Sequence, residues 1–146
     1  MKSTKNIKIF IDANIFIAAV GSEQGGSALI LKACCKGKFI PVTTALILKE
    51  AKKNIINKFN QEAVTSLYKL LSGLKLKICQ IDPKMAQEQY GDLIDKKDAH
   101  VVVGAILSKS DFLLTLDKKH FFTKKIQKAK LACIIVTPKM FIENYL

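Results

Sequence analysis

IKIFIDAN, residues Ile7–Asn14, is the stretch of sequence that decides the fold. The apolar run Ile7–Ile11 has the composition of a buried strand, and it ends abruptly at Asp12. The same pattern recurs late in the chain, where the strand candidate Phe112–Leu116 ends at Asp117. The carboxyl ends of the strands in an open parallel sheet share one crevice. We therefore expect these two acids to meet there.

Short β-rich runs alternate with helical segments along the whole chain. The other predicted strands are Phe39–Val42, Leu76–Ile81 and Ala132–Val136, which are rich enough in apolar residues to be buried on both faces. The predicted helices are Ala28–Cys35 with Ser27 as N-cap, Ala45–Phe59, Gln61–Leu71, one beginning at Asp82-Pro83, Asp98–Leu107, a Lys-rich helix after Asp117, and one beginning at Thr137-Pro138. This alternation predicts a three-layer α/β/α sandwich with a central parallel five-stranded sheet. No linker divides residues 1–146, so we expect a single domain.

The charge of the chain suggests a polyanionic partner. Lys and Arg total 24 against 12 acids, all 24 are Lys, and the formal net charge is +12. RNA, DNA or an anionic membrane would suit such a surface, although a merely solvated Lys-rich surface is the alternative. Lys contacts phosphate as a point charge, so binding is expected to be directed at the backbone and salt-dependent. No apolar run approaches the length of a membrane span.

The cysteines indicate the cellular compartment. Cys34, Cys35, Cys79 and Cys133 form no CxxC pair, which excludes the common zinc patterns and argues against a disulfide framework. Apolar neighbours surround them. Reduced thiols of this kind are typical of a cytoplasmic protein.

Asp12 and Asp117 are the strongest candidates for function. An ion at the end of a buried strand loses hydration, which is costly unless the ion has a use. Asn14 could hold a neighbouring carboxylate or a metal-bound water. Thr115 points to the same side as Asp117 by strand alternation and could hydrogen-bond a carboxylate. The alternative is that both acids only cap a turn or a helix.

Asp98 and Glu50 are weaker candidates on spacing alone. Asp98 opens a helix-like run and lines up with Val102 and Ala105, the face that should look inward, but an acid at a helix N-terminus can also be a simple cap. Glu50 is followed three residues later by Lys53, a spacing typical of a solvated pair on a helix surface.

The remaining motifs argue against other site types. His100 and His120 stand alone, without a paired nucleophile or a metal-ligand spacing, so we interpret both as surface or core histidines. Gly25-Gly26-Ser27 lacks the Walker lysine, and no GxGxxG follows the first strand.

Three stretches together resemble the PIN-domain family, in particular its VapC-like ribonuclease toxins. IFIDANIFIAA is similar to the family's opening motif, a strand that ends in Asp-x-Asn. FIPVTTALILKEAKKNI is similar to its second motif, a Ser/Thr before a helix that carries a Glu. KKDAHVVVGAILSKSDFLLTLDKKHF is similar to its third and fourth motifs. The resemblance covers the chain from Ile7 to about Val136.

The resemblance implies a metal-dependent nuclease. It carries Asp12, Glu50, Asp98 and Asp117 over as an acidic quartet that binds Mg²⁺ or Mn²⁺. Asn14, Thr44 and Thr115 fall on the family's polar supporting positions. A toxin would also imply a small antitoxin partner and a homodimer, by resemblance alone. The lack of Arg departs from a common family means of gripping phosphate.

The hypothesis from sequence is therefore an endoribonuclease that hydrolyses RNA phosphodiester bonds. Two carboxylates ~4 Å apart repel by ~4 kcal/mol at an effective dielectric constant of ~20, so a cluster of them needs cations. Lys49, Lys53, Lys118 and Lys119 would attract the RNA backbone. The alternative is a non-catalytic PIN-like module that binds RNA or a protein. A phosphatase or phospho-receiver would need a second acid near Asp12, where the chain has Asn14.

Overall fold

One parallel sheet forms the centre of the protein. The structure is a computed structural model that describes residues 6–146. In this range the sheet has the strand order β3-β2-β1-β4-β5, and every neighbouring pair is parallel. The strands are β1 (Lys8–Ile11), β2 (Ile40–Thr43), β3 (Lys77–Ile78), β4 (Phe112–Leu114) and β5 (Ile134–Val136). The prediction of a central parallel five-stranded sheet is confirmed for this part of the chain.

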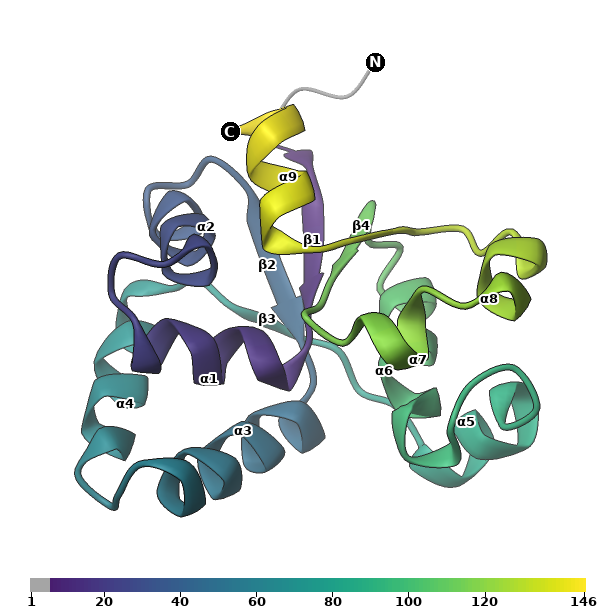
Figure 1. The fold of residues 1–146 in the computed structure, drawn as a ribbon, viewed down its shortest axis with the longest axis horizontal. Coiled ribbons are helices and arrows are strands. Elements are labelled where there is room, and N and C mark those ends of the chain that lie inside the picture. The colour runs from purple at the N-terminus through teal and green to yellow at the C-terminus, as the bar shows by residue number, and fades with distance from the viewer. Residues whose placement is uncertain (1–5) are drawn as a thin grey trace.

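Helices cover both faces of the sheet (Figure 1). One side carries α1 (Ala13–Gly21), α2 (Gly26–Cys35), α3 (Ala45–Lys58), α4 (Ala63–Gly73) and α9 (Pro138–Tyr145). The other side carries α5 (Pro83–Tyr90), α6 (Ala99–Leu107), α7 (Lys118–Phe121) and α8 (Lys124–Ala129), with the short 3₁₀ helix η2 (Lys96–Asp98) before α6. The three layers are those predicted from the sequence. In residues 6–146, none of these helices is both long enough and apolar enough to traverse a bilayer.

Helix α1 is an addition to the predicted helices. Its residues Ala13–Ala19 are apolar almost throughout, so they show no helical periodicity that would separate a buried face from an exposed one. The segment packs against both α2 and α3 and so is covered on more than one side.

Several predicted boundaries and burial patterns were wrong. β3 has two residues, both exposed, because it is an edge strand that pairs with β2 alone. α2 begins at Gly26 with Gly25 as N-cap, so Ser27 lies buried inside the helix. The predicted Lys-rich helix is two helices, because Thr123 caps a new one by accepting a hydrogen bond from the Ile126 amide.

The centre of the sheet is dry and tightly packed. Ile9, Phe10 and Ile11 of β1 are fully buried. Gly104 of α6 lies so close to Phe10 that a Cβ atom added at this position would overlap the phenyl ring. The helix therefore lies directly on the sheet, and its N-terminal end beside Asp98 is held near the carboxyl ends of the strands.

The crevice expected in an open parallel sheet lies between β1 and β4. The two strands are neighbours, with Ile11 paired to Leu114. The chain leaves β1 toward α1 on one side of the sheet and leaves β4 toward α7 on the other side (Figure 1). Such a divergence of neighbouring strands is the usual position of a ligand site.

Candidate metal centre

Asp12 lies at the end of β1 and is held by three hydrogen bonds. Its side chain is the N-cap of α1, because Oδ1 accepts from the Ala13 amide at 2.8 Å. Oδ2 accepts from the Thr115 hydroxyl at 2.9 Å and from Asn14 Nδ2 at 3.2 Å. The residue is 6% exposed. Its carboxylate therefore has a fixed orientation at the bottom of the crevice.

Asn14 and Thr115 tie the end of β1 to the segment that follows β4. Asn14 Nδ2 also donates to Thr115 Oγ1 at 3.2 Å, and Asn14 Oδ1 accepts from the Leu116 amide at 3.0 Å. Thr115 Oγ1 accepts from the Asp117 amide at 3.1 Å. The position of Asp117 is thus coupled through one hydroxyl group to the position of Asp12.

Asp98, Asp117 and His120 form a second group beside the first. His120 Nδ1 lies 2.7 Å from Asp117 Oδ2 and 3.6 Å from Asp98 Oδ2. Asp117 Oδ1 accepts from the His120 amide at 3.1 Å, which makes it the N-cap of α7. One ligand atom from each residue lies within 4.8 Å of the other two. The three side chains are half-buried, at 18%, 26% and 28% exposure for Asp98, Asp117 and His120.

Asp98 does not act as the helix cap that its position suggested. It precedes α6, but its side chain makes no capping hydrogen bond. Its Oδ2 atom is buried and, within residues 6–146, accepts no hydrogen bond. A buried carboxylate oxygen without a donor is costly unless a cation satisfies it. This atom is the sharpest indication that a cation belongs in the crevice.

Glu50 lies in α3, whose N-cap is Thr44. The Thr44 hydroxyl accepts from the Ile47 amide at 3.1 Å, and the residue is buried. Glu50 is exposed, unlike the other three acids. Its charge nevertheless contributes to the pKa of Asp12. Thr44 therefore positions the helix that brings Glu50 toward the crevice.

The pKa values indicate that the four acids act on one another. The pKa of Asp12 is raised from 3.8 to about 6, chiefly by burial and in addition by the charges of Glu50 and Asp98, against the hydrogen bonds from Thr115 and Ala13, which lower it. Burial is also the main reason why the pKa of Asp98 is raised. The His120 ring lowers that pKa, and the charge of Asp117 raises it.

Among the described residues, no lysine makes an ion pair with Asp12, Asp98 or Asp117, although the charge of Lys97 lowers the pKa of Asp98. The ion pairs of Asp98 and Asp117 are both made with His120. Lys49, Lys53, Lys118 and Lys119, the predicted contacts to RNA, are exposed to solvent on α3 and α7. Carboxylates that gather without an ammonium group at ion-pair distance match the ligand preference of hard divalent ions.

Two hollows lie near the crevice, and a third lies away from it. The first has a volume of about 510 Å³ and is lined by Asn14, Ile17, Ala18, Asn54, Asn57, Lys58 and Leu116, so it reaches the network around Asp12. The second, of about 450 Å³, is lined by the loop Gly91–Asp95 together with Lys119, His120, Thr123 and Lys125.

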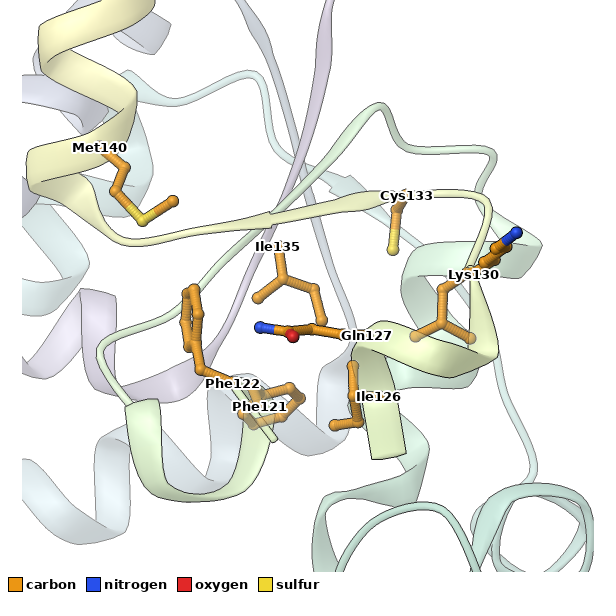
Figure 2. Close-up of a pocket in the computed structure, with 9 residues that line it drawn as sticks. Phe121, Phe122, Ile126, Gln127, Lys130, Cys133, Ile135 and Met140 are labelled. Atoms are coloured by element: carbon orange, nitrogen blue, oxygen red, sulfur yellow. The ribbon is translucent and has the colours of Figure 1, made fainter. Parts of the chain in front are cut away.

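The third hollow is the pocket in Figure 2, which is enclosed by α7, α8, β5 and the start of α9. It is lined largely by apolar side chains, among them Phe121, Phe122, Ile135 and Met140. It has a volume of about 350 Å³ and contains none of the four acids. We therefore assign the site to the crevice and not to this pocket.

His120 is the residue of the site that the sequence interpretation missed. A lone histidine carries no signal by itself, and Asp98 is distant in sequence. The spacing of Asp117 and His120 at the start of a helix is the one local sign, because residues three apart share a helix face. His100 is buried in α6, and burial lowers its pKa.

The fold and the crevice define a parallel α/β protein with carboxylates gathered at the carboxyl edge of its sheet. Residues 8–119 match the sequence model of the PIN domain. The chain therefore belongs to the PIN-domain family, as the sequence motifs indicated.

Solved structures support the same fold. A chain of VapBC2 from Rickettsia felis, crystallised with a DNA fragment from their promoter, has 18% identity and a TM-score of 0.63, and the match covers 90% of this chain and 98% of that chain. PAE2754 from Pyrobaculum aerophilum has 17% identity and a TM-score of 0.58, with 90% and 92% covered. A comparison with curated proteins gave no match.

Family membership agrees with the chemistry of the crevice. PIN domains are in general nucleases and typically use divalent metal ions. The group Asp98, Asp117 and His120 has the donor atoms and the proximity to hold such an ion.

Proposed function

We propose that this protein is an endoribonuclease that hydrolyses RNA phosphodiester bonds with Mg²⁺ or Mn²⁺. In this proposal Asp12, Glu50, Asp98 and Asp117 hold the metal. The observation that carries it is the buried Asp98 Oδ2 atom, which lacks a donor among the described residues and lies beside Asp117. A bound divalent ion would lower the pKa of a water molecule and offset negative charge on the departing oxygen.

The residues around the metal have different roles in this proposal. The hydrogen bonds from Thr115 and Asn14 fix the direction of the Asp12 carboxylate before any ion or substrate arrives. Glu50 is exposed and keeps the freedom to approach or to leave the crevice. Two acids held by hydrogen bonds, Asp12 and Asp117, together with a half-buried and an exposed one, suit a site that must admit a bulky phosphodiester.

RNA would reach the site through the hollow that ends at Asn14. The amides of Asn54 and Asn57 and the ammonium group of Lys58 line this hollow. Amide groups can hydrogen-bond to bases, and lysines attract phosphates. Lys49, Lys53, Lys118 and Lys119 extend the positive surface around the negative crevice. The affinity for RNA should therefore fall steeply as salt rises.

Cleavage of a fluorescent single-stranded RNA by the tag-free protein, with Mg²⁺, with Mn²⁺ and with EDTA, tests the proposal. Asp12→Asn should abolish the metal-dependent cleavage while circular dichroism shows an intact fold. Asp82→Asn is the matched control, because Asp82 caps the exposed start of α5 and lies outside the crevice. Equal cleavage by the Asp12 variant and the unchanged protein would defeat the proposal.

We further propose a toxin role with an antitoxin partner, and a homodimer as the assembled form. The support is the similarity in fold to a chain of a VapBC2 complex. The four cysteines are free, which suits a cytoplasmic protein. Overexpression should arrest growth, and Asp12→Asn should relieve the arrest. A growth arrest that the variant leaves unchanged would contradict a nucleolytic toxin.

A non-catalytic binding module is the second candidate function. One observation favours it: Asp12 and Asp117 both cap helices, so each has a structural role without any metal. Isothermal titration with Mn²⁺ separates the two candidates, because a pure binding module would take up no ion.

A further inference from the structure

We propose that His120 is a nitrogen ligand of the metal ion held by Asp98 and Asp117, and that it makes this part of the site prefer Mn²⁺ to Mg²⁺. The inference rests on the proposed metal-dependent function and adds a residue outside the acidic quartet, together with a selectivity. Its basis is the arrangement of three ligand atoms, the orphaned oxygen of Asp98 and the access to His120 from solvent.

The spacing of the three atoms fits one shared ion. Adjacent ligands of an octahedral ion with metal–oxygen distances of 2.0–2.1 Å lie about 3 Å apart. His120 Nδ1 lies 2.7 Å from Asp117 Oδ2 and 3.6 Å from Asp98 Oδ2. Small rotations of these half-buried side chains would bring both distances to that value. His120 Nδ1 lies near an oxygen of both acids, as it must if all three atoms bind the same ion.

Hydrogen bonding within the group leaves room for an ion. Asp117 Oδ2 is paired with His120 Nδ1, but Asp98 Oδ2 accepts no hydrogen bond from any described residue. Nδ1 either donates a proton to the Asp117 carboxylate or, without that proton, shares a cation with it. Only the second state also satisfies Asp98 Oδ2, because a cation reaches all three atoms.

A hydrated ion has a route to His120. The imidazole lines the hollow of about 450 Å³ that lies between the loop Gly91–Asp95, α7 and the start of α8. The ring is 28% exposed. The Asp12 carboxylate, in contrast, is buried and surrounded by donors. The ion can therefore enter on the side of His120 without disturbing the network around Asp12.

The donor set decides the selectivity. Mg²⁺ prefers oxygen ligands and loses its waters reluctantly, so a neutral imidazole offers it little. Imidazole is a better ligand for first-row transition metals, and Mn²⁺ accepts oxygen and nitrogen together. A purely carboxylate quartet would lack this distinction. One nitrogen among the oxygens should thus raise the affinity for Mn²⁺ more than that for Mg²⁺.

Electron spin echo envelope modulation on the tag-free, Mn²⁺-loaded protein tests the proposal directly. The chain has two histidines, so a coupling from ¹⁴N that changes on ¹⁵N-histidine labelling must come from one of them. We expect this coupling in the unchanged protein and its loss in His120→Gln. Gln keeps the backbone amide that Asp117 caps, so the start of α7 is preserved.

Isothermal titration supplies the second readout. His120→Gln should weaken Mn²⁺ binding on the order of tenfold, the lower end of what altering the surroundings of a metal ligand costs. Mg²⁺ binding should change little. Bound Mn²⁺ without a histidine coupling would overturn the proposal and reduce His120 to an orienting partner of Asp117. A coupling that persists in His120→Gln would assign the ligand to His100 and would also overturn it.

The outcome is separable from that of the proposed function. RNA cleavage that depends on Asp12, in a protein whose bound Mn²⁺ shows no histidine coupling, defeats this inference alone. A histidine coupling in a protein that cleaves no RNA defeats the nuclease proposal alone. Failure to bind either ion at any concentration would defeat both.

Discussion

The two halves of the crevice are built in opposite ways. Asp12 is buried and receives hydrogen bonds from Ala13, Asn14 and Thr115, so the protein itself holds its carboxylate. Asp98 has a buried oxygen that no described residue satisfies, and its partner His120 is partly open to solvent. The first half is preorganised by the fold. The second half is left incomplete, and it is the half that a cation would complete.

The largest expected effect concerns the burial of Asp12. A pKa of about 6 in the folded protein, against 3.8 ordinarily, means that ionisation of Asp12 costs about 3 kcal/mol of stability. The direction in which stability changes with pH follows from which state, folded or unfolded, releases the proton of Asp12 first. The unfolded chain releases this proton near pH 4 and the folded chain near pH 6, so stability falls as pH rises between these values and stays lower above them.

Urea unfolding in EDTA at about pH 3 and about pH 8, below and above both pKa values, measures this cost. The free energy of unfolding of Asp12→Asn, relative to that of the unchanged protein, should rise by about 3 kcal/mol between the two pH values, because Asn does not titrate. A difference that does not depend on pH would mean that Asp12 is not held at a desolvation cost. The contrast between the two halves would then be lost.

The next largest effect concerns the incomplete half. Mn²⁺ at 100 times its Kd should stabilise the folded protein by about 2.7 kcal/mol, and Asp98→Asn should lose most of this gain. Without metal the same variant should be at least as stable as the unchanged protein at neutral pH, because the burial that raises the pKa of Asp98 makes its charge unfavourable in the folded state. Thermal or urea unfolding with and without Mn²⁺ measures both quantities.

Asp95→Asn is the matched control for this measurement. Asp95 is an exposed acid that caps η2 through the Lys97 amide, a short distance along the chain from Asp98. It should keep most of the gain from Mn²⁺, because its charge acts on Asp98 without belonging to the group Asp98, Asp117 and His120. If both variants keep it, Asp98 does not hold the ion.

Thr115 links the two halves and should have a somewhat smaller effect. Thr115→Val removes the hydroxyl that donates to Asp12 and accepts from the Asp117 amide and from Asn14 Nδ2, so three polar groups lose a partner. We expect a loss of about 2 kcal/mol in the free energy of unfolding. Thr115→Ser keeps the hydroxyl and is the control. Equal loss in both variants would assign the effect to packing and not to the hydrogen bonds.

Glu50 should have the smallest effect on stability. It is exposed on α3, so Glu50→Gln should change the free energy of unfolding of the metal-free protein by less than about 0.5 kcal/mol. The variant should at the same time lower RNA cleavage, if Glu50 enters the site with the substrate. A large loss of stability would contradict a side chain that is free to move.

The sequence predicted the parts of the fold that have a local signature. Strands that end in an acid, such as the one before Asp12, and the cap and proline at Asp82-Pro83 were readable because burial and capping act on a few neighbouring residues. Helix α1 was not predicted, because a segment that packs against several elements is apolar on most sides and shows no helical periodicity. β3 was predicted too long, since a single edge partner leaves a strand short and exposed.

The site could be predicted only in part for the same reason. Asp12 and Asp117 interrupt apolar runs, which makes them visible. Glu50 has polar and apolar neighbours alike, so it needed the family resemblance. His120 depends on a meeting with Asp98 that only the packing of α6 on the sheet brings about. A contact between two distant elements leaves no pattern in either of them.

The absence of a side chain at Gly104 allows α6 to lie close to Phe10 of β1, and so determines how near Asp98 lies to the carboxyl ends of the strands. The methyl group of an alanine there would overlap the ring of Phe10, and α6 would have to move away from the sheet. Asp98 directly precedes that helix, so its carboxylate would move away from Asp12 although the residue itself is unchanged. The distance between the carboxylates of Asp98 and Asp12 therefore depends on a packing contact in the core. A substitution at residue 104 should change this distance without changing any of the ligand residues.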